Sequence, residues 1–192
     1  MTSKSMLATA AVAACLLAAP AHSQDSAKWG EVGGWSIRVD RTIGDGCYAH
    51  QSYEDGTDVR VGFDMKKKSI FFMIANPAWR SLEVGKTYRM RLVFDGQQSY
   101  DGEFRGLRMG DWVWLDHSNV SAAFAGDFMQ RNSLRVYYNG TRIAGLSLRN
   151  TYLAVTEVMN CQRESAGSGR SGTGSQPATH PFARRPADPF SR

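Results

Sequence analysis

Histidines are the first residues to consider as catalysts, because they titrate near neutral pH. The central part of the sequence contains His50 and His117. A Ser–His–Asp arrangement needs a carboxylate that orients the histidine, and Asp116 is the acid beside His117. Neighbouring residues on a strand point to opposite faces, so Asp116 is badly placed for that role. Since the Gly-x-Ser-x-Gly motif is also missing, the sequence disfavours a serine hydrolase.

Paired carboxylates are the next candidates, because glycoside cleavage uses two acids about 5–10 Å apart. Asp101 and Glu103 would share one face of a strand. However, Asp101 precedes a glycine, and Asp-Gly is typical of a turn for backbone reasons. The sequence holds neither a phosphate-binding glycine loop nor a zinc-helix motif, and neither Cys47 nor Cys161 has a neighbour at ligand spacing. We therefore predict no catalytic residue, no metal site and no cofactor, which favours a protein that is not an enzyme.

Tryptophans offer a binding site in place of a catalytic one. Trp112 and Trp114 alternate along a predicted strand and share a face, and His117 follows them. Exposed indoles form a platform for sugars or peptides, whereas buried indoles fill the core of a sheet. We favour burial for a domain of this size, and we keep these three residues as candidate binding residues.

The C-terminal segment 164–192 contains two copies of the pattern Pro-Phe-small-Arg. The first copy places Phe182 beside Arg184, and the second places Phe190 beside Arg192. The segment is rich in Gly, Ser and Pro and has no apolar periodicity, so we predict that it is disordered. A chance repeat in a biased composition is the simpler interpretation. The alternative is a bivalent linear motif that binds a partner.

Residues 1–23 have the layout of a secretory signal. A short positive region at Lys4 precedes an apolar run over residues 6–19, and small residues follow at the expected cleavage position. We therefore expect a periplasmic or secreted protein. Cys15 follows small residues, as in lipoprotein signals, but the apolar run continues beyond it. Lipid anchoring through Cys15 is therefore the lesser alternative.

The remaining cysteines, Cys47 and Cys161, are an even pair in an exported chain and predict one disulfide. We expect a single globular domain over residues 24–163, where 18 Lys and Arg side chains nearly balance 16 Asp and Glu side chains. No basic stripe is present, so we predict that the domain does not bind nucleic acid. After the signal, no apolar run reaches the roughly 20 residues of a transmembrane helix.

Alternating apolar residues predict strands along most of this domain. Residues 35–40 and 88–94 alternate clearly, and residues 69–75 are apolar on both faces, as in a strand that is covered on both sides. Asn139-Gly140 is the type I′ hairpin signal. In total we expect eight or nine antiparallel strands with two short helices. The predicted class is mainly β, an antiparallel β-sandwich or a partly closed barrel.

The segment 133–161 joins a strand, the Asn139-Gly140 turn, a return strand and a helix that ends at Cys161. This arrangement resembles small exported bacterial β-rich proteins of unassigned function. The resemblance implies a periplasmic or secreted setting, and it carries no catalytic residues with it.

Two functional hypotheses follow from these observations. The first is an exported protein-binding or envelope-associated module without catalytic activity, whose partner is an envelope or extracellular protein. The second is a small-ligand-binding or hydrolytic β-barrel with a site lined by Trp and His side chains. A pocket in which Trp112, Trp114 and a histidine converge would favour the second hypothesis.

Overall fold

Residues 26–168 fold into one antiparallel sheet with two α-helices and a short 3-10 helix. The computed structural model describes residues 26–168. Within this range the ten strands lie in the order β1-β2-β3-β4-β5-β8-β7-β6-β9-β10. Their bounds are β1 (Ser26–Val32), β2 (Trp35–Asp40), β3 (Gly46–Ser52), β4 (Asp58–Asp64), β5 (Ser69–Ala75), β6 (Thr87–Phe94), β7 (Gln98–Met109), β8 (Trp112–Ser118), β9 (Ser133–Tyr138) and β10 (Thr141–Ser147). The helices are α1 (Ala122–Gln130), α2 (Thr151–Ser168) and the 3-10 helix η1 (Arg41–Ile43).

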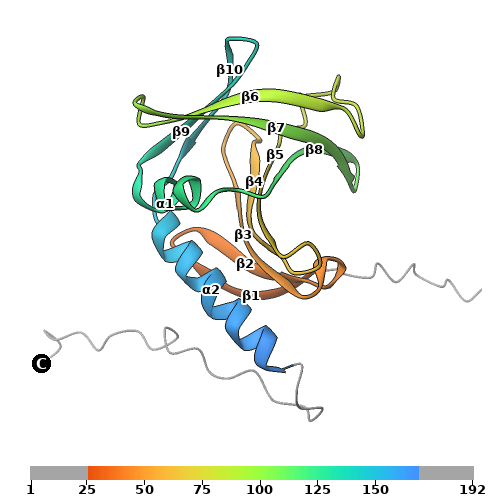
Figure 1. Cartoon of the computed structure of the whole chain (residues 1–192), viewed down its shortest axis with the longest axis vertical. Coiled ribbons are helices and arrows are strands. Elements are labelled where there is room, and N and C mark those ends of the chain that lie inside the picture. The colour runs from red at the N-terminus through yellow and green to blue at the C-terminus, as the bar shows by residue number, and fades with distance from the viewer. Residues whose placement is uncertain (1–25, 169–192) are drawn as a thin grey trace, which may run out of the picture.

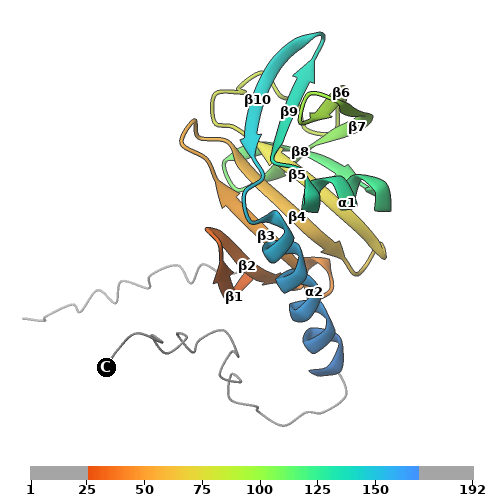
Figure 2. The same cartoon turned by 90° about the vertical axis from the view of Figure 1, so that its left-hand side faces the viewer.

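The sheet curls around α1 and α2 without closing on itself, as Figures 1 and 2 show. β1 and β10 are its two edges. Both edges are irregular, because the pairing register shifts between Lys28 and Gly30 in β1 and between Arg142 and Ala144 in β10. The structure therefore confirms a mainly β, antiparallel fold of the open type, with ten strands in place of the eight or nine predicted.

The core fills the concave side of the sheet, between the strands and the helices. β6 buries alternate residues on this side, namely Tyr88, Met90, Leu92 and Phe94. Phe72 of β5 lies at the centre, where its ring packs edge-on against Phe124 and Phe128 of α1 at centroid distances of 5.6 and 5.9 Å. Burying one such side chain contributes about 1.5–3 kcal/mol, so this face drives the folding of the sheet.

β1 is the strand that the sequence pattern did not predict. Most of its residues are exposed or half-buried, so it shows little apolar alternation. Besides its pairing with β2, it contacts α2 through the Trp29 indole N–H, which donates to Glu157 Oε1 at 3.1 Å. In the turn between β1 and β2, the Gly33 carbonyl oxygen accepts a hydrogen bond from Asn150 Nδ2 at 3.0 Å. The first hairpin is therefore held by the last helix.

The predicted disulfide is confirmed. It joins Cys47 on β3 to Cys161 on α2, with their Cα atoms 6.0 Å apart and both residues fully buried. The Cys47 backbone N–H also donates to Gln162 Oε1 at 2.9 Å. α2 continues to Ser168, past the end of the domain expected at Arg163. No helix among residues 26–168 is long and apolar enough to cross a bilayer.

Removing the disulfide is expected to lower the free energy of unfolding by about 2–5 kcal/mol, because the unfolded chain gains conformational freedom. The test is urea denaturation of the Cys47→Ala/Cys161→Ala variant, which leaves no unpaired thiol at this position. Wild-type protein reduced with dithiothreitol is the matched comparison and should lose a similar amount. Equal stability of the reduced and oxidised proteins would contradict the prediction.

Candidate functional site

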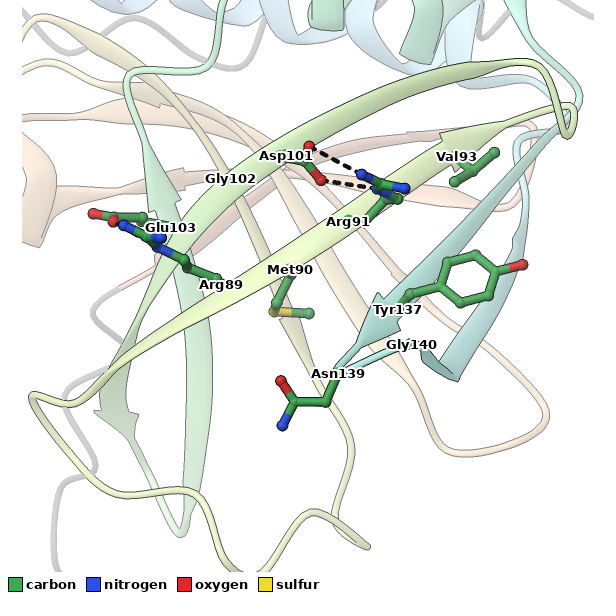
Figure 3. A pocket seen from close by; sticks show the side chains of 10 residues that line it. All are labelled: Arg89, Met90, Arg91, Val93, Asp101, Gly102, Glu103, Tyr137, Asn139 and Gly140. Atoms are coloured by element: carbon green, nitrogen blue, oxygen red, sulfur yellow. Dashed lines mark hydrogen bonds and ion pairs between the residues drawn. The ribbon is translucent and has the colours of Figure 1, made fainter.

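A charged groove lies on the convex face of the sheet, turned away from α1 and α2, which we call the outer face. The groove has a volume of about 850 Å³ and spans β6, β7 and the turn between β9 and β10 (Figure 3). Arg89 and Arg91 line it from β6, and Asp101 and Glu103 line it from β7. Because alternate residues of β6 are buried in the core, the two arginines between them must point outward. We call this cavity the ion-pair groove.

The register between β6 and β7 pairs the charges of the groove. Arg91 lies opposite Asp101, and Arg89 lies opposite Glu103. Arg91 Nε donates to Asp101 Oδ1 at 2.9 Å, and Arg89 Nε donates to Glu103 Oε1 at 3.4 Å. The hydrogen bond from Arg91 holds the pKa of Asp101 below its ordinary value, and Asp101 raises the pKa of Arg91. The groove therefore presents exposed charges of both signs in a fixed order (Figure 3).

The prediction that Asp101 lies at a turn is wrong. β7 runs unbroken from Gln98 to Met109, and the preceding turn is made by Asp95 and Gly96, which have φ angles of 46° and 75°. A carboxyl group that acts as a general acid near neutral pH needs a raised pKa. Because both carboxylates of the Asp101 and Glu103 pair already bond to arginines, neither is free to protonate a leaving group, and the pair does not suit glycoside cleavage.

A second hollow on the outer face surrounds Arg60 of β4, and we call it the Arg60 pocket. Its volume is about 260 Å³. The guanidinium carbon of Arg60 lies 5.1 Å from the ring centroid of Tyr48 and 4.6 Å from that of Trp114. The cation therefore stacks between two aromatic rings. Beneath it, Phe71 and Met73 of β5 are buried in a small apolar cluster that is separate from the main core.

Gly62 makes room for the strand that carries Tyr48. The two residues lie opposite each other in the β3–β4 pair. A Cβ atom at Gly62 would lie 2.3 Å from the Cys47 carbonyl oxygen and 2.5 Å from Tyr48 Cβ. These distances are too short for any side chain, so glycine at this position allows the aromatic residue to lie across it.

Gly62→Ala is expected to lower the free energy of unfolding by about 1–3 kcal/mol, because the added methyl group overlaps backbone atoms of β3. Gly145→Ala on β10 is the matched control, since a Cβ atom there meets nothing within 4 Å. The control should leave stability unchanged or raise it slightly. Both free energies can be measured by urea denaturation, and equal effects of the two substitutions would refute the packing argument.

A third hollow, of about 480 Å³, opens beside the β9–β10 hairpin. Trp79 and Leu82, from the loop between β5 and β6, form one wall, and Leu115, Tyr138 and Ile143 are among the residues of the other. Both side chains also pack against the main core. The lining is mostly apolar, unlike that of the ion-pair groove, and we call this cavity the apolar mouth.

The structure places the predicted binding residues on two different faces. Trp114 is buried, with 4% of its surface exposed, whereas Trp112 is 40% exposed. His117 lies on the opposite face of β8, where its ring stacks on Phe104 at a centroid distance of 4.9 Å. The tryptophans and His117 therefore do not line a common pocket. The other predicted residues lie outside the described range: Phe182, Arg184, Phe190 and Arg192.

His50, Ser52 and Asp58 form a hydrogen-bonded cluster on the outer face. His50 Nε2 lies 3.1 Å from Asp58 Oδ1, and the Ser52 hydroxyl donates to the same oxygen. In a catalytic triad the serine bonds to the histidine, whereas both groups in this cluster bond to the carboxylate. The serine is therefore not activated by the histidine. Within residues 26–168, no group of three or more His, Cys, Asp and Glu side chains is arranged to hold a metal ion.

His50 should make the stability of the fold depend on pH. Burial and then the positive charge of Arg60 lower the pKa of His50 from its ordinary value of 6.5, and Asp58 opposes this only in part. Below about pH 6.5 the unfolded chain therefore binds a proton that the folded protein binds less readily. The free energy of unfolding is expected to fall as the pH decreases from 6.5 towards the lowered pKa of His50, and to level off below it.

The measurement is a set of thermal melts between pH 8 and pH 5 for the wild type and for His50→Gln. The substitution keeps a hydrogen-bonding side chain beside Asp58 and removes the titrating group. Its melting temperature should change less with pH across this interval than that of the wild type. If both proteins show the same slope, the assignment to His50 fails.

Comparison with known proteins adds information about the fold. No family model matches the sequence, and no curated protein matches it. One solved structure with a similar fold is that of invasion-associated protein B from Bartonella henselae. The two chains share a fold. The TM-score is 0.51 at 12% sequence identity, and the match covers 70% of this chain and 97% of that one. The resemblance to bacterial β-rich proteins is therefore confirmed at the level of the fold.

Sequence reasoning missed the ion-pair groove and the Arg60 pocket, although signals for both were present. Arg89 and Arg91 alternate with apolar residues, and acids alternate in the same way beyond the Asp95-Gly96 turn. Such a pattern places the charges opposite each other once the hairpin register is known. For the pocket, the signal was Tyr48 facing Gly62 across a hairpin, an arrangement in which an aromatic ring covers a glycine.

Proposed function

We infer that this chain is an exported bacterial protein of the cell envelope that binds a partner protein through the outer face of its sheet, without catalysing a reaction. The observation that carries this inference is the ion-pair groove, whose exposed charges of both signs are held in register by two neighbouring strands. Fixed charge patterns of this kind contribute specificity to protein interfaces and reject partners with the wrong pattern.

Export and envelope association are supported by separate features. The Cys47–Cys161 disulfide is typical of proteins that fold in an oxidising compartment. The signal layout of residues 1–23 points to the periplasm or the exterior. The similar fold of a bacterial protein whose name describes it as invasion-associated fits this setting.

Aromatic residues on the outer face supply the apolar anchors that a protein interface needs. Tyr137 lines the groove from β9, and Trp112 is exposed at the start of β8 on the same face of the sheet. Tyr and Trp are the residues that most often dominate binding energy at interfaces. The C-terminal pattern with Phe182, Arg184, Phe190 and Arg192 remains a proposal for a second contact, and its support comes from the sequence.

A second candidate function, the binding of a small apolar ligand, is favoured by the apolar mouth. The size of this cavity, about 480 Å³, lies within the usual range for small-molecule sites. Its tryptophan is Trp79, whereas the sequence-based hypothesis relied on Trp112, Trp114 and His117. The two candidate functions therefore use different cavities, which allows one experiment to distinguish them.

The experiment places a photo-reactive phenylalanine analogue at Tyr137 of the full-length protein in its own envelope. Tyr152 on α2 is the control position, because it is 59% exposed and lies away from the groove. We expect a cross-linked partner protein from position 137 and none from position 152. Arg89→Gln with Arg91→Gln should reduce this cross-link several-fold at a nearly unchanged melting temperature, since both side chains are exposed and the substitutions place no like charges opposite each other.

Equal cross-linking from positions 137 and 152, or none from either, would refute the groove as the binding site. Native mass spectrometry of the same purified protein tests the second candidate. A retained small molecule that is lost in Trp79→Ala would support ligand binding at the apolar mouth. Deletion of residues 181–192 in the same assay tests the C-terminal contact, which is expected to weaken cross-linking if the repeated pattern takes part.

A further inference from the structure

The Arg60 pocket is built from segments that lie far apart in the sequence. Its walls come from β2, η1, β3, β4, β5, β7 and β8, with Lys67 from the turn between β4 and β5. The apolar part of the lining consists of Ile43, Phe71, Met73, Leu107 and Met109. The pocket therefore combines the Arg60 guanidinium, a tyrosine hydroxyl and an apolar surface in a volume of about 260 Å³, and it is also lined by the charged residues Asp40, Asp64, Lys67, Arg108 and Asp116.

Arg60 carries a positive charge that no described residue neutralises by direct contact. No ion pair or hydrogen bond joins its guanidinium to another residue within positions 26–168, and its Nε is buried without an acceptor. Its flat faces are covered by the rings of Tyr48 and Trp114. The N–H groups at its edge are therefore the part of the side chain that is able to bind a ligand.

The carboxylates that line the same pocket already have donors from the protein. Asp40 accepts hydrogen bonds from the backbone N–H and the hydroxyl of Thr42. Asp64 accepts from the backbone N–H of Lys67 and forms an ion pair with its Nζ at 3.4 Å. Asp116 accepts from the Ser118 hydroxyl at 2.9 Å. Arg108, the remaining charged lining residue, donates to the Asp111 carbonyl oxygen at 3.4 Å, so Arg60 is the group without a partner.

The Tyr48 hydroxyl is a second polar group of the pocket that has no hydrogen-bond partner among the described residues. Only 1% of this residue is exposed. A buried donor without an acceptor destabilises a fold by about 1–3 kcal/mol. Two such donors, Arg60 Nε–H and Tyr48 O–H, line one cavity, and both require an acceptor oxygen.

We propose that the Arg60 pocket binds a carboxylate carried by a small apolar group. The carboxylate would accept hydrogen bonds from Arg60 Nε–H and Tyr48 O–H, and the apolar group would lie against Phe71, Met73 and Leu107. Neighbouring side chains cover both donors in the structure, so binding requires the flexible Arg60 side chain to move outward and open the pocket. Charge-assisted hydrogen bonds between arginine and carboxylate are among the strongest in proteins, particularly where aromatic rings exclude water. This site is separate from the ion-pair groove, so the proposal does not depend on the function inferred above.

Such a carboxylate has two sources, a free small acid or the C-terminal residue of a peptide. The probes are N-acetyl-L-leucine and a pentapeptide that ends in leucine, each compared with its C-terminal amide. The readout is the ¹H–¹⁵N resonance of Arg60 Nε–Hε in the full mature protein, assigned with the Arg60→Lys variant. We expect saturable shifts with both carboxylates and binding at least about tenfold weaker with the amides, which lack the ionised acceptor.

Tyr48→Phe is the decisive variant, because it removes only the hydroxyl group and keeps the ring that stacks on Arg60. It should weaken carboxylate binding about ten- to hundredfold, the usual effect of losing one hydrogen bond to a charged group. Without a ligand it should melt at the same temperature as the wild type or higher, because it deletes a buried unpaired group. Tyr137→Phe, in the ion-pair groove, is the control and should change neither value.

The binding measurements distinguish the two sources of the carboxylate and can also overturn the proposal. Tighter binding of the pentapeptide identifies a peptide terminus as the source, and equal or tighter binding of N-acetyl-L-leucine identifies a free acid. Amides that bind as well as the acids would overturn the proposal. The same holds for an Arg60 resonance that does not respond to either carboxylate, or for a Tyr48→Phe variant that binds as the wild type does.

Discussion

The coverage of the concave sheet face by α1 and α2 is the constraint on which the rest of the structure depends. An open sheet of ten strands would otherwise expose its apolar inner residues to water. α2 is held against β3 by the Cys47–Cys161 bond, and it holds β1 through Trp29 and Glu157. Once these contacts fix which side is inner, the two-residue period of each strand fixes which side chains point outward.

Because the inner face packs against the helices, the charged side chains of the ion-pair groove and the Arg60 pocket lie on the outer face of the sheet. In the ion-pair groove every charge already has a partner within the sheet, so the groove is suited to a surface whose charges match it. In the Arg60 pocket the cation has no such partner, and burial surrounds it with aromatic and apolar groups. The same cation lowers the pKa of the neighbouring His50, so its charge affects residues beyond its own pocket. The two cavities therefore differ in the charge that they present to solvent.

The sequence predicted those features that depend on neighbouring residues. The alternation over residues 88–94 and the Asn139-Gly140 turn are local, and both are present in the structure. β1 was missed because it is a half-exposed edge strand held by a contact between Trp29 and Glu157, residues far apart in the sequence. The turn propensity of Asp101 was overridden by pairing with β6. The Arg60 pocket depends on register across several strands, which a single sequence does not display.

The register shifts in β1 and β10 have a consequence for how the molecule meets other proteins. An open sheet offers two rows of unpaired backbone groups, which invite further strands to add and chains to aggregate. A bulge in each edge strand interrupts the regular spacing that such addition requires. Lys28 beside one bulge and Arg142 beside the other add charge at the same places. The bulges and charges therefore oppose fibre-like growth from the margins of the sheet, and they leave the side chains on its faces as the surface for contact with other molecules.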